Sequence, residues 1–233
     1  MGVGILYGQS MQHIIVFDVN ETLLNLEPVR IWFSERFDNQ PNASQWFSEL
    51  LRLSFVSSVL DRYHPFTDLG AAALETTASI QGTHTSEDDI ERIRGILTTL
   101  PAHEDVSRGL DRLRKAGFSV AALTNSPQRA AEAQLDNAGI ANLFDSIMSV
   151  EMVHRFKPHA SVYGAAARNL GVDTPDLVMV AAHDWDVAGA LAAGCDGVFV
   201  SRSGQTYSPS FPPPTLRAHD VPDAATQIIS RYP

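Results

Sequence analysis

An aspartate closes the first apolar run of the sequence. Residues 13–18 (HIIVFD) are almost wholly β-branched and aromatic, which predicts a strand buried on both faces of a parallel sheet. Asp18 is the last residue of that run. A carboxylate at the carboxyl end of a strand is poorly placed for packing but well placed to attack a bound electrophile. Asp18 is therefore a candidate nucleophile.

Polar residues also follow three later apolar runs. These clusters are Thr124-Asn125-Ser126, Lys157 with Pro158, and the segment 183–186 (HDWD). Parallel strands bring their carboxyl ends to one edge of a sheet, where ligands bind beside the topological switch point. The clusters are thus expected to converge with Asp18 on a single site. This convergence is a more specific sign of an active site than any one cluster alone.

The elements that must position these residues alternate along most of the chain. Further strands are predicted at 119–124, 146–150, 177–182 and 197–201, and helices at 106–116, 128–138, 161–170 and 185–193. Each of these helices is followed by a glycine, the usual left-handed residue at a helix end. This alternation predicts an α/β fold with a doubly wound parallel sheet.

Residues 28–100 break the alternation and are expected to be wholly helical. The segments are 28–37, 43–63, 66–80 and 86–100, the last with Ser86 and Asp89 as a helix-start signal. Helices inserted directly after the first strand form a cap over the sheet edge. The expected domains are a core of 11–27 and 101–233, a helical cap of 28–100, and residues 1–10 as an upstream extension.

Composition limits the classes of partner. Against 17 Lys and Arg stand 27 Asp and Glu among 233 residues, a formal net charge of −10, which argues against nucleic acid or an anionic membrane as the main partner. The single cysteine, Cys195, excludes a disulfide framework and fits a reducing cytoplasm. No run of about 18 apolar residues is present to span a membrane. We expect a cytoplasmic enzyme.

The strand-end motifs resemble those of a known family. The segments FDVNETL, LTNS, FKPHASVY and VAAHDWDVAGA are similar to successive motifs of the haloacid dehalogenase superfamily, over roughly residues 12 to 200. The closest resemblance is to type II (S)-2-haloacid dehalogenases. It implies a Rossmann-like core with a helical cap, a homodimer, and no metal or cofactor. It further implies that an aspartate displaces halide from a small anionic 2-haloacid, and that water hydrolyses the ester to a 2-hydroxy acid.

Two positions separate this chain from the superfamily's phosphatases. Those enzymes need a second Asp two residues after the nucleophile, where Asn20 stands, and a Mg²⁺-binding Asp where Ala182 stands. An amide cannot protonate a leaving alkoxide and a methyl group cannot bind a hard cation. Asp184, at a shifted register, is a possible Mg²⁺ ligand, so a Mg²⁺-dependent phosphatase or phosphonate hydrolase stays an alternative function. A catalytically weak relative and an enzyme that opens strained rings also stay open.

The resemblance also implies roles for individual residues. Asp18 would be the nucleophile, and Lys157 would orient it and stabilise its charge. Asp186 and His183 would hold and deprotonate the hydrolytic water, His183 with an ordinary pKa of about 6.5. A structural histidine is the alternative there. The expected hydrogen-bonding residues are Thr22, Thr124 and Asn125, and the other expected pocket residues are Val19, Asn20, Phe47, Phe66, Tyr163 and Trp185.

One departure from the family bears on the halide site. A cap arginine that the resemblance assigns to the leaving halide aligns with Phe47, and the family's cap phenylalanine aligns with Phe66. Either Arg52 or His64 supplies the missing charge, or Asn125 and ring edges hold a smaller halide. A serine and an asparagine of the family's last motif become Ala181 and His183. Some members of a subgroup with these substitutions resemble defluorinating enzymes, which makes fluoroacetate or another small haloacid a candidate substrate.

Overall fold

A six-stranded parallel sheet forms the centre of the described chain, which in this computed structural model comprises residues 13–38 and 40–233. The strand order is β3-β2-β1-β4-β5-β6. The extension expected at residues 1–10 lies outside the described residues. The strands are β1 (Ile14–Phe17), β2 (Val120–Thr124), β3 (Ser146–Ser149), β4 (Leu177–Ala181), β5 (Asp196–Val200) and β6 (Leu216–Ala218).

Helices fall into two groups along the chain. Four follow β1 directly, before any helix of the alternating pattern: α1 (Glu27–Phe37), α2 (Ala43–Val59), α3 (Phe66–Ile80) and α4 (Glu87–Thr98). The others alternate with strands or follow the last one: α5 (Val106–Lys115), α6 (Gln128–Asn137), α7 (Ala160–Leu170), α8 (Asp184–Ala192) and α9 (Val221–Arg231). The start signal at Ser86 and Asp89 forms a capping box on α4, as predicted.

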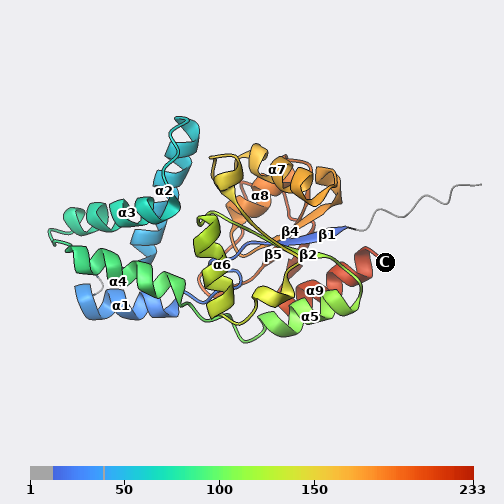
Figure 1. Ribbon diagram of the computed structural model, residues 1–233, viewed down its shortest axis with the longest axis horizontal. Coiled ribbons are helices and arrows are strands. Elements are labelled where there is room, and N and C mark those ends of the chain that lie inside the picture. Colours follow the sequence, from blue (N-terminus) through green and yellow to red (C-terminus); the bar gives the residue numbers. More distant parts are fainter. Residues whose placement is uncertain (1–12, 39) are drawn as a thin grey trace, which may run out of the picture.

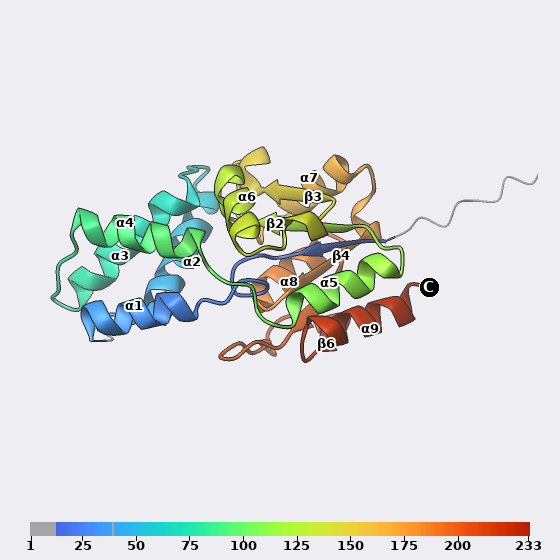
Figure 2. The same ribbon diagram turned by 60° about the horizontal axis from the view of Figure 1, so that its bottom comes forward.

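The first four helices form a lobe to one side of the sheet. Figures 1 and 2 show α1–α4 gathered beyond the end of β1 that is opposite the N-terminus, and we call residues 27–98 the helical lobe. Around the sheet, α5 and α9 lie side by side on one face, while α7 and α8 lie on the other (Figure 1). This is the doubly wound α/β arrangement that the sequence predicts.

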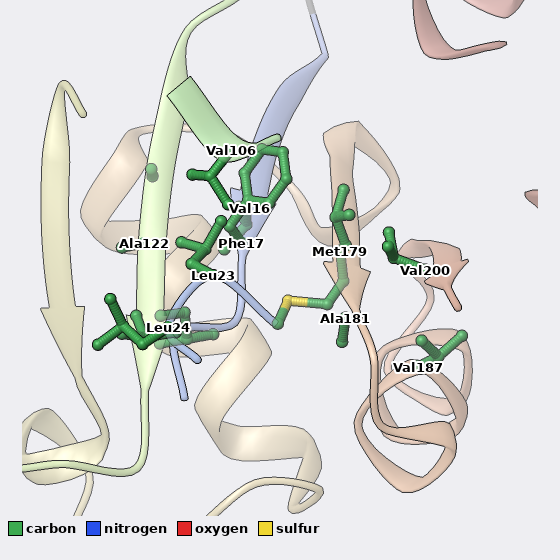
Figure 3. Packing of buried hydrophobic residues seen from close by; sticks show 14 of the residues in the cluster. Val16, Phe17, Leu23, Leu24, Val106, Ala122, Met179, Ala181, Val187 and Val200 are labelled. Carbon is green, nitrogen blue, oxygen red and sulfur yellow. The ribbon is translucent and has the colours of Figure 1, made fainter. Parts of the chain in front are cut away.

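The central strands are apolar along their whole length because both faces of the sheet are covered. Every residue of β2 and β4 is buried. Figure 3 shows Val16 and Phe17 of β1 with Met179 and Ala181 of β4 beside them. Since β1 has β2 on one side and β4 on the other, the loops that follow these strands meet at one edge, the switch point of the sheet.

Two details differ from the sequence prediction. The strand β6 follows the proline-rich loop of residues 208–214 and was not predicted, since it has three residues and only Ala218 is buried. The helix predicted over 43–63 ends at Val59, because Asp61 adopts a left-handed φ of 55° and Pro65 restricts the backbone before it. Within the described chain, no helix combines the length and apolarity that crossing a membrane requires.

A glycine in α8 allows the loop after β3 to approach the sheet edge. A Cβ at Gly189 would lie 2.7 Å from the Tyr163 hydroxyl and closer still to Pro158. We therefore expect Gly189→Ala to lower the free energy of unfolding by roughly 1–3 kcal/mol, as for an overpacked core. The measurement is urea denaturation followed by circular dichroism.

The matched control is Gly95→Ala in α4. A Cβ there meets no atom within 4 Å, so this variant should be neutral or stabilising by up to about 1 kcal/mol through helix propensity. Equal stability of the two variants would contradict the close approach at Gly189.

Candidate active site

Asp18 lies directly after β1 with its carboxylate almost fully buried, at 4% exposure. Its backbone N–H donates to the Val180 carbonyl at 3.0 Å, which fixes it against β4. The Thr22 hydroxyl donates to Asp18 Oδ2 at 2.7 Å and accepts from the Ala182 N–H at 2.9 Å. Thr22 thereby links the loops after β1 and β4 and holds one carboxylate oxygen in place.

Lys157 is fully buried and connects two carboxylates. Its Nζ donates to Asp18 Oδ1 at 2.8 Å, to Asp186 Oδ2 at 2.7 Å and to the Leu123 carbonyl at 2.9 Å. All three ammonium protons are therefore used. The backbone N–H of Lys157 donates to Asn125 Oδ1 at 3.1 Å, so Asn125 positions the loop that carries the lysine.

This pairing separates the behaviour of the two aspartates. Burial alone disfavours ionised Asp18, but the Lys157 ammonium and His183 outweigh it and hold the pKa of Asp18 well below its usual range. For Asp186, burial and the nearby charge of Asp18 outweigh Lys157 and raise the pKa. Asp18 therefore gives up its proton more readily than Asp186, and Asp186 is the better proton acceptor.

Tyr163 supports Asp186 from α7. Its hydroxyl donates to Asp186 Oδ1 at 2.7 Å and lies 3.0 Å from the Asp186 carbonyl. Burial and the Asp186 charge raise the pKa of Tyr163 well above its ordinary value, so the phenol keeps its proton. Tyr163 therefore acts on Asp186 and makes no hydrogen bond to Asp18.

His183 lies between two carboxylates. Nδ1 is 3.2 Å from Asp18 Oδ2, and Nε2 is 3.0 Å from Glu21 Oε2. Ionised carboxylates only accept hydrogen bonds, so both ring nitrogens must carry protons to make both bonds. Burial opposes this charge, but the bonds to Asp18 and Glu21 raise the pKa of His183 to about 9. His183 is an imidazolium at neutral pH.

Glu21 is the residue that the sequence reasoning missed. It adopts a left-handed φ of 67° in the turn after β1, which aims its buried side chain at His183. Arg30 lies 3.2 Å from Glu21 Oε1, and Gln205 Nε2 donates to Oε2 at 2.9 Å. The available signal was an acid one residue before Thr22, inside the quoted motif, although its histidine partner lies far along the chain.

The predicted aromatic residues fall in two groups. Phe47 and Trp185 lie against His183, with ring centroids 5.8 Å and 5.0 Å from the imidazole. Phe66 packs at 5.7 Å from the ring of Phe156 and lines a cavity under the helical lobe. One ring from the lobe and one from the sheet domain, by which we mean residues 13–26 and 99–233, therefore pack against the imidazolium and help to bury it.

The other predicted residues make no hydrogen bond to Asp18. Thr124 accepts from the Ser126 N–H at 3.1 Å and closes the turn after β2, and Val19 is a fully buried core residue. The side chain of Asn20 is bonded to other residues than Asp18: its Oδ1 accepts from Gln134 at 3.2 Å and its Nδ2 donates to the Ser126 hydroxyl at 3.2 Å. Asn20 belongs to a polar chain beside the site.

Neither cation suggested in place of the cap arginine lies at the site. Arg52 is exposed and donates two hydrogen bonds to Glu49, at 2.6 Å and 2.7 Å, on the outer face of α2. His64 is exposed in the loop before α3. The resemblance could not show which way these two side chains point. The positive charges beside Asp18 are those of Lys157 and His183.

The helical lobe is bonded to the loop of Lys157 and to helix α6. The Ser58 hydroxyl accepts from the Phe156 N–H at 2.8 Å, directly before Lys157, and Arg155 donates to the Ser58 carbonyl at 2.8 Å. On another side, Gln134 donates to the Leu97 carbonyl at 2.8 Å. The lobe is thus tied to the loop of the lysine and, through Gln134, to the polar chain of Asn20.

The donor set does not resemble a cation site. The Lys157 ammonium already lies between the two aspartates, and Ala182 offers no oxygen from its side chain. Within residues 13–38 and 40–233, no group of three or more His, Cys, Asp or Glu side chains is arranged to hold a metal.

This chain belongs to the haloacid dehalogenase-like hydrolases: the model of that family matches residues 13–194. It is 26% identical over 217 residues to (S)-2-haloacid dehalogenase H-109 of Pseudomonas putida, covering 92% of this chain and 97% of that one. The structure of L-2-haloacid dehalogenase from Xanthobacter autotrophicus superposes with a TM-score of 0.85 at 22% identity, covering 93% and 98% of the two chains. The structure of a defluorinating L-2-haloacid dehalogenase superposes with a TM-score of 0.78 at 19% identity, covering 93% of this chain and 94% of that one. The resemblance inferred from the motifs is confirmed.

The charge on His183 makes a testable contribution to stability. Its pKa rises from 6.5 to about 9 on folding, so the stabilisation is complete below pH 6.5 and is lost as the pH rises through 9. The facing charges are Asp18 and Glu21, and Lys157 and Arg30 lie behind them. Between pH 6.5 and 9.5, the difference in unfolding free energy between the wild type and His183→Asn should shrink by up to about 3 kcal/mol. Urea denaturation at each pH measures it, and a difference independent of pH would show a neutral ring.

Proposed function

We propose that this protein hydrolyses the carbon–halogen bond of short 2-haloacids, with Asp18 as the nucleophile. The observation that carries the proposal is the contact of 2.8 Å between Lys157 Nζ and Asp18 Oδ1, which keeps a buried carboxylate ionised. An ionised carboxylate is the nucleophilic form. The names of the relatives point to the same reaction.

The first step is displacement at C2 of the substrate. An Asp18 oxygen forms a bond to C2 from the side opposite the halogen, the carbon–halogen bond breaks, and its electron pair leaves with the halide. The leaving group needs no proton, so the reaction tolerates Asn20 where a phosphatase needs an acid. The configuration at C2 inverts.

The second step is hydrolysis of the ester on Asp18. Water attacks the carboxyl carbon of Asp18, and Asp186 accepts a proton from it and returns it to the departing oxygen of the 2-hydroxy acid. The second water proton leaves to solvent, and Asp18 is again a carboxylate. Burial supports this role, because it raises the pKa of Asp186 and so strengthens it as a base.

His183 serves this reaction as a cation in our scheme. With both nitrogens directed at carboxylates, the ring has no lone pair to take a proton from water. Its positive charge instead offsets the substrate carboxylate beside Asp18, the contribution that the resemblance assigns to a cap arginine.

The test is release of halide from chloro-, bromo- and fluoroacetate and from 2-chloropropionate. We expect release that is unaffected by EDTA, and loss of release to the uncatalysed background in Asp18→Asn, because an amide is not an effective nucleophile. Asp136→Asn, an exposed residue of α6, is the control and should keep the wild-type rate.

Two results would contradict this proposal. Halide release by Asp18→Asn would remove the covalent mechanism. Phosphate release from phosphomonoesters that EDTA abolishes, without any halide release, would assign the protein to the phosphatases.

The roles of Asp186 and His183 differ in the fate of the ester. Asp186→Asn should accumulate the ester on Asp18 because hydrolysis lacks its base, whereas His183→Asn should slow ester formation without accumulation. Intact-protein mass spectrometry after mixing with chloroacetate detects the ester, and a single turnover in ¹⁸O-water should label Asp18 before the product. An ester that accumulates in His183→Asn instead would make that histidine the base.

A further inference from the structure

A cavity of about 190 Å³ lies between the helical lobe and the sheet domain. Trp46, Leu50 and Phe66 line it from the lobe, and Asn20 and Gln134 line it from the other side. An apolar cavity of about 150 Å³ is enough to hold a benzene ring. This space is therefore larger than a two-carbon haloacid requires. Its lining includes Asn20, two residues after Asp18 in the chain, and Phe47, whose ring also lies against His183.

The amide of Gln134 has a fixed orientation in this cavity. The Leu97 carbonyl can only accept, so the group that faces it at 2.8 Å is Nε2, which also donates to Asn20 Oδ1 at 3.2 Å. Both Nε2 protons are thus used, and Oε1 is the free end. Gln134 is only 4% exposed, and within the described residues its Oε1 has no donor.

The neighbouring polar groups do not supply that donor. Asn20 uses its Nδ2 on the Ser126 hydroxyl at 3.2 Å. Arg94, the one cation among the described cavity residues, is half-exposed at the rim and lies 3.4 Å from Asp68. A buried carbonyl oxygen without a donor is unfavourable, so an N–H or O–H from a water molecule or a ligand in the cavity must reach Gln134 Oε1.

We propose that this cavity binds the 2-substituent of the substrate, an apolar group with a hydroxyl or N–H that donates to Gln134 Oε1. The inference rests on the proposed function, in which C2 of the acid is held at Asp18, and it defines the substrate class further. The preferred 2-haloacids carry a ring or branched chain with one donor, as haloacids derived from hydroxyaryl or amide side chains do.

Unreactive acids test the cavity separately from catalysis. Isothermal titration calorimetry of the wild type compares propionate, 3-phenylpropionate, and the 3-hydroxyphenyl and 4-hydroxyphenyl forms of the latter. We expect the phenyl acid to bind at least about tenfold more tightly than propionate, because the ring is buried. One hydroxyphenyl isomer should bind a further about three- to tenfold more tightly through the new hydrogen bond.

Three variants locate the effect. Gln134→Met removes the acceptor and should abolish the advantage of the hydroxyl. The control is Gln227→Met on α9, which loses a similar hydrogen bond of 2.8 Å from the side-chain amide to the Arg217 carbonyl of β6. This variant should keep the advantage of the hydroxyl. Gly70→Ala adds a Cβ 3.8 Å from Trp46 and 3.9 Å from Leu50, an ordinary contact. It narrows the cavity and should weaken both phenyl and hydroxyphenyl acids while keeping their ratio.

The proposal is overturned in either of two ways. If neither hydroxyl isomer binds more tightly than the phenyl acid, or if the advantage survives in Gln134→Met, water satisfies Gln134 and the donor is not part of the ligand. If aryl acids bind no more tightly than propionate, the cavity does not take the substituent. Halide release from chloroacetate is measured separately, so failure of catalysis and failure of the cavity proposal are distinguishable.

Discussion

The buried ammonium of Lys157 is the interaction on which the rest of the site depends. Removing one partner from a buried ion pair typically costs about 3–5 kcal/mol, because the other charge is left uncompensated. Here one ammonium pairs with both Asp18 and Asp186, so loss of its charge would leave two buried carboxylates without their shared cation. Asn125 and Ser58, which hold the loop around Lys157, are positioning residues in this sense.

A second cation balances the acidic side of the same cluster. Asp18, Asp186 and Glu21 bring three carboxylates together, and Lys157 with His183 returns two positive charges, with Arg30 on the outer side of Glu21. In a chain of net charge −10, these cations offset the negative charge around Asp18, as the approach of the proposed anionic substrate requires. In the proposed mechanism, His183, charged through its neighbours, takes the part that the resemblance assigns to a cap arginine.

The sequence predicted the fold and the central residues because these depend on local patterns. Strand-end polar residues identified Asp18, Lys157 and Asp186, since parallel strands leave little freedom in where their carboxyl ends meet. Contacts between distant segments could not be predicted. The hydrogen bond between Glu21 and His183 depends on a left-handed turn at Glu21. Nothing in the sequence around Gln134 shows that its side chain contacts Leu97 of α4. The expected homodimer and cytoplasmic location stay predictions.

The bonds between the lobe and the site loops have a mechanical consequence. Ser58 ties α2 to the loop before Lys157, and Leu97 ties α4 to Gln134 on α6. Arg30 of α1 adds an attachment on a third side, to Glu21 in the turn after β1, so moving the lobe as one body would break bonds on all three sides. Because these attachments reach the loop of Lys157, the Asn20 chain and Glu21, a displaced lobe would disturb the residues that hold or adjoin Asp18.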